Sequence, residues 1–155
     1  MHLSMPAMGQ PSAATPQEQK KSEIATLKEN AAAEDPAAQL QLGFFYYWGT
    51  SVTADYDEAE KWYLMAAIHE NTAAQQGLAR VYQRRSRDKH DQTEAFFWYS
   101  LCAKNWKPYA GCEQVYPSCP DGRDVMRKYL SDEQVSAAEK RVEEWKPPAA
   151  PVPEK

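Results

Sequence analysis

The chain of 155 residues contains only 6 glycines and 3 cysteines, and it has no Gly-rich phosphate-binding loop. Cys112 and Cys119 are seven positions apart, which does not match the Cys-x₂₋₄-Cys spacing of a zinc site. The histidines also lack metal-ligand spacing from one another; they are His2, His69 and His90. We therefore expect no metal and no cofactor.

The chain also lacks long apolar runs and an excess of basic charge. No run reaches the roughly 18–20 apolar residues that span a bilayer. With 18 basic and 22 acidic residues, the formal charge of −4 gives no general attraction to nucleic acid or anionic membranes. The first residues do not read as a signal peptide, although a trimmed chain would look the same. A periplasmic or secreted location, with the signal removed, and a cytoplasmic one both stay open.

Sustained alternation of period two is absent, so the sequence predicts no strands. Residues 1–14 are rich in Pro, Ala, Ser and Met and are expected to form a flexible lead-in. Residues 147–155 form a Pro-rich tail that cannot continue a helix. The predicted domain therefore covers residues 15–146 and is all-α.

An internal repeat appears when the chain is shifted by 36 residues. Trp62-Tyr63 then meets Trp98-Tyr99, and Asp55 meets Asp91. Chance would hardly align a Trp-Tyr pair and an acidic helix cap at one offset. The other matches include Leu42 with Leu78, Tyr46 with Tyr82, and Glu58-Ala59 with Glu94-Ala95.

Each unit is predicted to be a pair of helices, named helix A and helix B in chain order. Asp35-Pro36 and Asp55 with Glu58 are helix-start signals, and Gly49 is a stop signal. The expected helices cover residues 36–48 and 56–70 in unit one and residues 72–84 and 92–104 in unit two. Flanking helices are expected at 15–33, 122–130 and 132–146.

These residues resemble the Sel-one-like repeat (SLR), a relative of the tetratricopeptide repeat. Unit one carries the family pattern at Ala38, Leu42-Gly43, Tyr46, Gly49, Asp55, Ala59, Trp62-Tyr63 and Ala66-Ala67. The resemblance implies a short α-solenoid with repeats at about 36–71 and 72–107 and a C-terminal cap at 121–146. It also implies a non-catalytic adaptor or scaffold, often in bacterial envelope or signalling complexes.

In tetratricopeptide-like stacks the A helices line the concave face, which is where partners usually dock. Unit one would present an apolar patch there, and unit two would present amide and guanidinium groups. We therefore expect a protein or peptide partner with an apolar anchor and acidic flanks, and a monomer or weak oligomer. The alternatives are that the N-terminal segment covers the patch, or that the protein is an immunity or inhibitor protein for a toxin. The predicted concave residues are Leu40, Phe44, Tyr47, Trp48, Gln76, Arg80, Gln83 and Arg84.

The cysteines allow a different class of function. Cys102 stands where unit one has Ala66 and is expected to be buried. Our preferred hypothesis is a Cys112–Cys119 disulfide, with pairing of Cys102 to one of them, or three reduced thiols, as alternatives. A Cys-dependent enzyme is the competing reading, but the sequence shows no convincing Cys-His pair, and we predict no catalytic residue.

Overall fold

The computed structural model describes residues 15–85, 88–106 and 118–147, and every regular element in these ranges is an α-helix. The lead-in at 1–14 and residues 148–155 of the tail lie outside the described residues. The prediction of an all-α fold is confirmed. The helices are α1 (Pro16–Ala32), α2 (Pro36–Trp48), α3 (Tyr56–Ala67), α4 (Thr72–Arg85), α5 (Lys89–Lys104), α6 (Cys119–Arg127) and α7 (Asp132–Glu144).

Short polar side chains start the helices as the sequence predicts. Thr15 and Ser131 form complete capping boxes with Glu18 and Gln134. The carboxylate of Asp35 accepts from the backbone N–H of Ala37 at 2.9 Å. These side chains satisfy backbone donors that have no partner inside the helix, and they fix where each helix begins.

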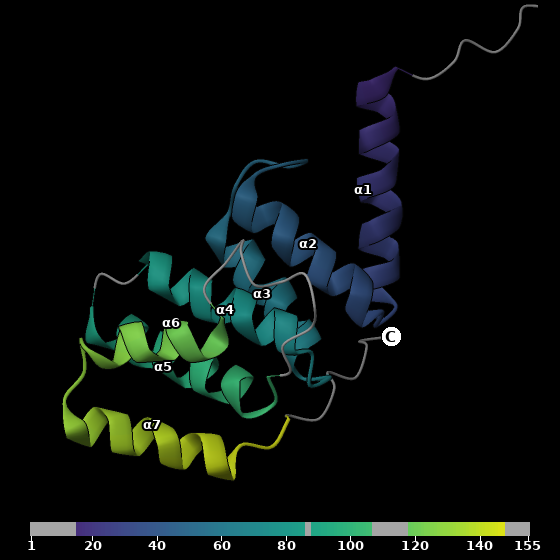
Figure 1. The fold of residues 1–155 in the computed structure, drawn as a ribbon. Coiled ribbons are helices and arrows are strands. Elements are labelled where there is room, and N and C mark those ends of the chain that lie inside the picture. Colours follow the sequence, from purple (N-terminus) through teal and green to yellow (C-terminus); the bar gives the residue numbers. More distant parts are fainter. Residues whose placement is uncertain (1–14, 86–87, 107–117, 148–155) are drawn as a thin grey trace, which may run out of the picture.

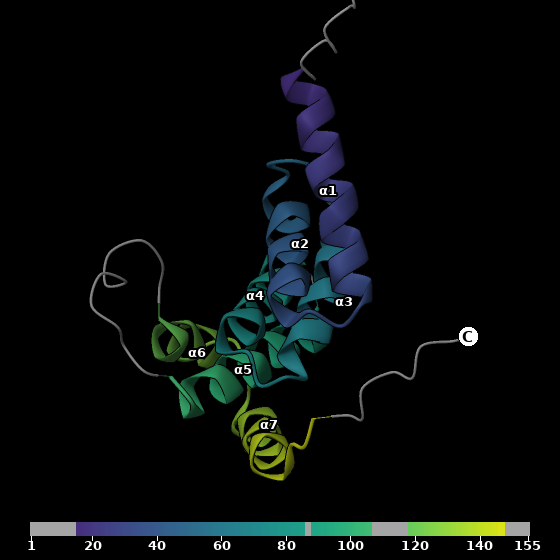
Figure 2. The same cartoon turned by 90° about the vertical axis from the view of Figure 1, so that its right-hand side faces the viewer.

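The helices form a stack of antiparallel pairs (Figure 1). α2 packs against α3, α3 against α4, and α4 against α5, while α1 contacts α2 at one end. Both α6 and α7 pack against α5, so α1 and α7 lie at opposite ends of the stack, as the turned view also shows (Figure 2). The core runs along this stack and contains the predicted pairs Trp62-Tyr63 and Trp98-Tyr99, all of which are buried.

Glycines set the spacing between helices. The ring of Tyr63 lies between Gly43 of α2 and Gly77 of α4, where added Cβ atoms would stand 2.5 and 2.7 Å from ring carbons. Tyr99, one repeat later, lies in the same way against Gly122 of α6. The helix α6 therefore occupies the helix-A position of a third, incomplete unit.

A disulfide joins Cys102 of α5 to Cys119 of α6, with 5.8 Å between their Cα atoms. The preferred Cys112–Cys119 pairing is therefore wrong, and Cys112 itself lies outside the described residues. Relative to the glycines, Cys119 matches Ala74, just as Cys102 matches Ala66. Spacing within the loop could not show this, because the pairing depends on α6 repeating the placement of α4.

Some helix bounds differ from those predicted. α5 begins one turn early, at Lys89, because the carboxylate of Asp88 caps it by accepting from the N–H of Asp91 at 2.9 Å. α3 ends at Ala67 and α7 at Glu144, both earlier than expected. α6 begins at Cys119, earlier than residue 122, because Ser118 and Asp121 form a capping box with Pro120 in the first turn.

Candidate protein-binding groove

A groove of about 470 Å³ lies between α2 and α4 on the helix-A side of the stack. That volume falls within the range of small-ligand and peptide side-chain sites. Six of the eight predicted concave residues line it: Leu40, Phe44, Tyr47, Trp48, Gln76 and Arg80. Its remaining lining residues are Ala37, Gln41, Tyr63, Ala73 and Gly77.

The two walls of the groove are repeat equivalents with opposite chemistry. On α2, Leu40, Phe44 and Trp48 are four apart and therefore share one helix face. The residues 36 positions later on α4 are Gln76 and Arg80, which line the groove, and Arg84, which lies just beyond it. One wall is therefore apolar and the other is polar and cationic.

Small residues open the floor. The floor contains Tyr63 and Gly77, and Ala37 and Ala73 flank it at repeat-equivalent positions. Gly77 must lack a side chain because the ring of Tyr63 occupies the place of its Cβ. Because Gly77 has no side chain, α4 can pack closely against the Tyr63 ring, and the space above that ring stays open as part of the groove.

The apolar wall is exposed. The side chains of Phe44 and Trp48 are 42% and 40% exposed, and their ring centroids are 6.3 Å apart. Tyr47, by contrast, is buried, with its ring 4.9 Å from that of Trp48 and 5.6 Å from that of Tyr56. The aromatic cluster is thus anchored on its inner side and open on its outer side.

Tyr47 also links the two walls. Its hydroxyl accepts a hydrogen bond from Nε of Arg84, with 3.2 Å between N and O. This contact raises the pKa of Arg84, so the guanidinium stays charged. Arg84 and Gln83 are exposed residues beyond the groove lining, and the side-chain carbonyl of Gln83 accepts from the hydroxyl of Tyr99 at 2.8 Å.

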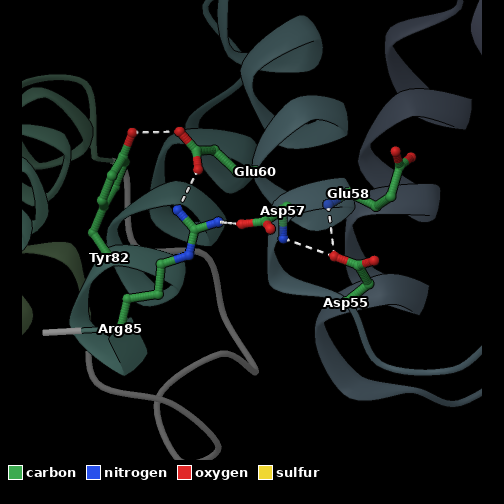
Figure 3. A network of polar contacts seen from close by, with 6 residues as sticks. All are labelled: Asp55, Asp57, Glu58, Glu60, Tyr82 and Arg85. Atoms are coloured by element: carbon green, nitrogen blue, oxygen red, sulfur yellow. Dashed lines mark hydrogen bonds and ion pairs between the residues drawn. The ribbon is translucent and has the colours of Figure 1, made fainter. Parts of the chain in front are cut away.

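The neighbouring arginine has a different environment (Figure 3). Arg85 forms ion pairs with Asp57 and with Glu60, the latter at 2.5 Å. Glu60 also accepts from the hydroxyl of Tyr82 at 2.6 Å. Arg85 is therefore neutralised within the α3–α4 contact.

Burial raises the pKa of both Tyr63 and Tyr99, and the positive charge of Arg80 partly opposes that rise. Arg80 is half-buried beside these two rings. Its role is therefore partly structural, and it is a less clean probe of the groove than the exposed Arg84.

Sequence reasoning found the walls of the groove but not its floor. Gly77 has no counterpart in the repeat pattern, because Gln41 stands at the matching position in unit one. The usable signal was a glycine in the middle of a helix, where it costs about 1 kcal/mol relative to alanine and so implies a packing reason.

Nothing in the described ranges assembles three or more metal-binding side chains. Two of the three cysteines are joined to each other, so neither supplies a thiolate nucleophile. Across residues 15–85, 88–106 and 118–147, no helix is long and apolar enough to cross a bilayer.

Comparison with known proteins agrees with the architecture. The family model described as the Sel1 repeat matches residues 36–71 and 72–105. No curated protein matches the sequence. Among solved structures, the chain is similar to the crystal structure of c5321, a protective antigen present in uropathogenic Escherichia coli strains displaying an SLR fold.

That similarity has a TM-score of 0.68 at 24% identity and covers 84% of this chain. It covers 26% of the antigen, so this chain spans about a quarter of that protein's length. At this identity the likeness concerns the fold alone. Sel1 repeats are typically protein-interaction modules, and this chain carries two of them within a described part that is helical throughout.

Proposed function

We propose that the protein is a non-catalytic adaptor that binds a segment of another protein in the groove between α2 and α4. The observation that carries the proposal is the exposed apolar wall. Phe44 and Trp48 are large, rigid and about two-fifths exposed at the edge of a groove, although exposed aromatic clusters are unfavourable without a partner. Aromatic side chains and arginine dominate the energetics of protein interfaces, and this groove has both.

A partner with an apolar anchor and an acidic flank fits the two walls. The anchor would contact Phe44 and Trp48, while the acidic flank would face the cationic wall of α4. No acidic side chain lines the groove within the described residues, so nothing there would repel such a flank.

We place this function in the periplasm or outside the cell. The Cys102–Cys119 bond supports that location, because disulfides persist in oxidising compartments and are rare in the cytoplasm.

Site-specific cross-linking tests the binding face. A photo-reactive p-benzoyl-phenylalanine is introduced at position 44 or, as the control, at position 64, and the protein is irradiated in its native host. Phe44 and Leu64 are exposed to 42% and 41%, but Leu64 lies on a helix-B face. We expect one discrete adduct from position 44 and none of that mass from position 64. Equal adducts from both positions, or none from position 44, would refute the groove as the binding site.

A further inference from the structure

We propose that Tyr47 and Arg84 form a receptor for a single Asp or Glu carboxylate of the partner segment, next to the apolar wall of the groove. The proposal rests on the proposed function, because it assumes that a segment lies in the groove. It adds which atoms would bind that segment and which side chain of the partner they would select.

The geometry of Arg84 is fixed from one side. Its Nε donates to the hydroxyl of Tyr47 at 3.2 Å, and the Tyr47 ring is itself buried between the rings of Trp48 and Tyr56. Holding Nε orients the planar guanidinium and reduces the side-chain entropy that binding would otherwise cost.

The remaining donors point to an anion. Within the described residues, the hydrogen bond to Tyr47 is the only hydrogen bond or ion pair that Arg84 makes, so both Nη groups retain their N–H donors. The Tyr47 hydroxyl accepts from Arg84, and its own hydrogen can still be donated. Two Nη groups beside a hydroxyl are suited to the two oxygens of a carboxylate.

The contrast with Arg85 shows that this arrangement is specific to one residue. Arg85 is the next residue on α4, yet its guanidinium is already neutralised by Asp57 and Glu60 (Figure 3). Arg84 carries an uncompensated charge on a chain whose formal net charge is −4. The two arginines therefore form a matched pair, one available to a partner and one occupied within the fold.

A carboxylate fits this place better than a phosphate. Arg84 and Trp48 lie in the last turns of α4 and α2, where the helix carbonyl ends carry partial negative charge. The guanidinium of Arg84, which has no ion pair with an acidic side chain among the described residues, matches the single charge of a carboxylate, whereas a phosphate carries about −1.5 to −2 and would leave more negative charge against these carbonyl ends.

The position relative to the apolar wall defines the partner. Arg84 is the repeat equivalent of Trp48 and contacts Tyr47, the neighbour of Trp48 on α2. A segment that buries an aliphatic or aromatic side chain against Phe44 and Trp48 would therefore bring an adjacent Asp or Glu to Arg84. The groove and Arg84 would therefore recognise two features of the partner together, an apolar side chain and one acidic side chain next to it.

Selection of random twelve-residue peptides displayed on phage against the intact protein tests this inference. We expect enriched peptides to pair an apolar residue with a nearby Asp or Glu and to lose binding to Phe44→Ala. For a resynthesised peptide, Arg84→Gln should weaken affinity about tenfold or more, the usual effect of a charge-assisted hydrogen bond. Tyr47→Phe should weaken it less, because the guanidinium remains but is no longer held.

Replacing the acidic residue of the peptide by its amide completes a double-mutant cycle with Arg84→Gln. The change from Glu to Gln should cost the wild-type protein about the same factor and cost Arg84→Gln almost nothing. Arg85→Gln is the matched control and should bind the peptide as the parent does. Peptides that need Phe44 but bind Arg84→Gln or the amidated form unchanged would overturn the carboxylate receptor and leave the proposed function intact. Peptides that never depend on Phe44 would overturn both.

Discussion

Tyr63 is clamped between two helix backbones, and this single ring explains two glycines that the helices would otherwise disfavour. The ring faces Gly43 on α2 and Gly77 on α4, so it cannot shift away from one without approaching the other. Interiors packed at this density respond even to one added methyl group.

Gly77→Ala should therefore destabilise the protein, although alanine is the better helix former. The new Cβ would lie 2.7 Å from a carbon of the Tyr63 ring. Overpacking of this kind costs about 1–3 kcal/mol, which exceeds the gain of about 1 kcal/mol in helix propensity. Urea unfolding of the variant and the parent measures the difference.

The same substitution in a Tyr63→Ala background is the control. With the ring removed, the added methyl group has space, and Gly77→Ala should become neutral or stabilising. A Gly77→Ala variant that is as stable as the parent in the wild-type background would show that the ring is not clamped.

Buried tyrosines should make the protein sensitive to alkali. The pKa values of Tyr63, Tyr82 and Tyr99 are all raised by burial above the ordinary value of 10.0. A raised folded-state pKa means that the stabilisation is complete below the unfolded pKa and is lost as the pH rises above it. We expect the free energy of unfolding to fall above about pH 10.

Unfolding measured from about pH 8 to about pH 11, with phenolate absorbance followed in parallel, tests this. Tyr63→Phe keeps the ring and removes the ionising group, so its curve should be flatter than that of the parent. A parent stability that is constant across the range would contradict the burial of these hydroxyls.

At the scale of elements, helix starts were predictable where the cap lies next to the helix in sequence. Asp35 before Pro36 and Ser131 before Asp132 both begin helices where expected. The start of α5 could not be predicted in this way, because Asp88 and Asp91 are both adequate helix caps and the local sequence does not choose between them. Glu94, the repeat equivalent of Glu58, lies beyond the first turn of this longer helix and pairs with Arg141 of α7 at 2.6 Å.

The disulfide shows how a spatial repeat can be invisible along the chain. The insertion between α5 and α6 moves Cys119 out of the 36-residue register, so only the placement of Tyr99 on Gly122 reveals the equivalence. The walls of the groove were predictable for the opposite reason, since their residues keep the register without a gap. The burial of Tyr47 and its hydrogen bond to Arg84 could not be predicted from the sequence, because both depend on how the helices pack against one another.

Replacing both cysteines, Cys102→Ala with Cys119→Ala, should lower stability by about 3 kcal/mol, the usual effect of opening a loop of this length. The bonded residues are 17 apart in sequence. Alanine already fills both equivalent positions, Ala66 and Ala74, and both are fully buried, so the variant should still fold. Thermal melting followed by circular dichroism measures the change.

Reductant provides the control for that measurement. It should lower the melting temperature of the parent and leave that of the double variant unchanged. If the parent is insensitive to reductant under conditions that expose all thiols, the bond contributes no stability.

For the whole molecule, the central feature is an asymmetric groove between α2 and α4 of the helical stack. One end of the stack is covered by α1 and the other by α6 and α7, and both Trp-Tyr pairs are buried in the core. The Phe44–Trp48 wall is left exposed beside a cationic wall. The fold thus separates residues that hold the stack together from residues that a partner can contact.

The most direct test of this account compares Phe44→Ala with Leu64→Ala, measuring melting temperature and affinity for the partner identified by cross-linking. The two side chains are exposed to 42% and 41%, so both variants should melt within a few degrees of the parent. We predict that Phe44→Ala weakens partner binding about tenfold or more, as loss of an aromatic anchor does, while Leu64→Ala binds as the parent does. Equal affinity of Phe44→Ala and the parent, or a larger loss in Leu64→Ala, would contradict the groove as the binding site.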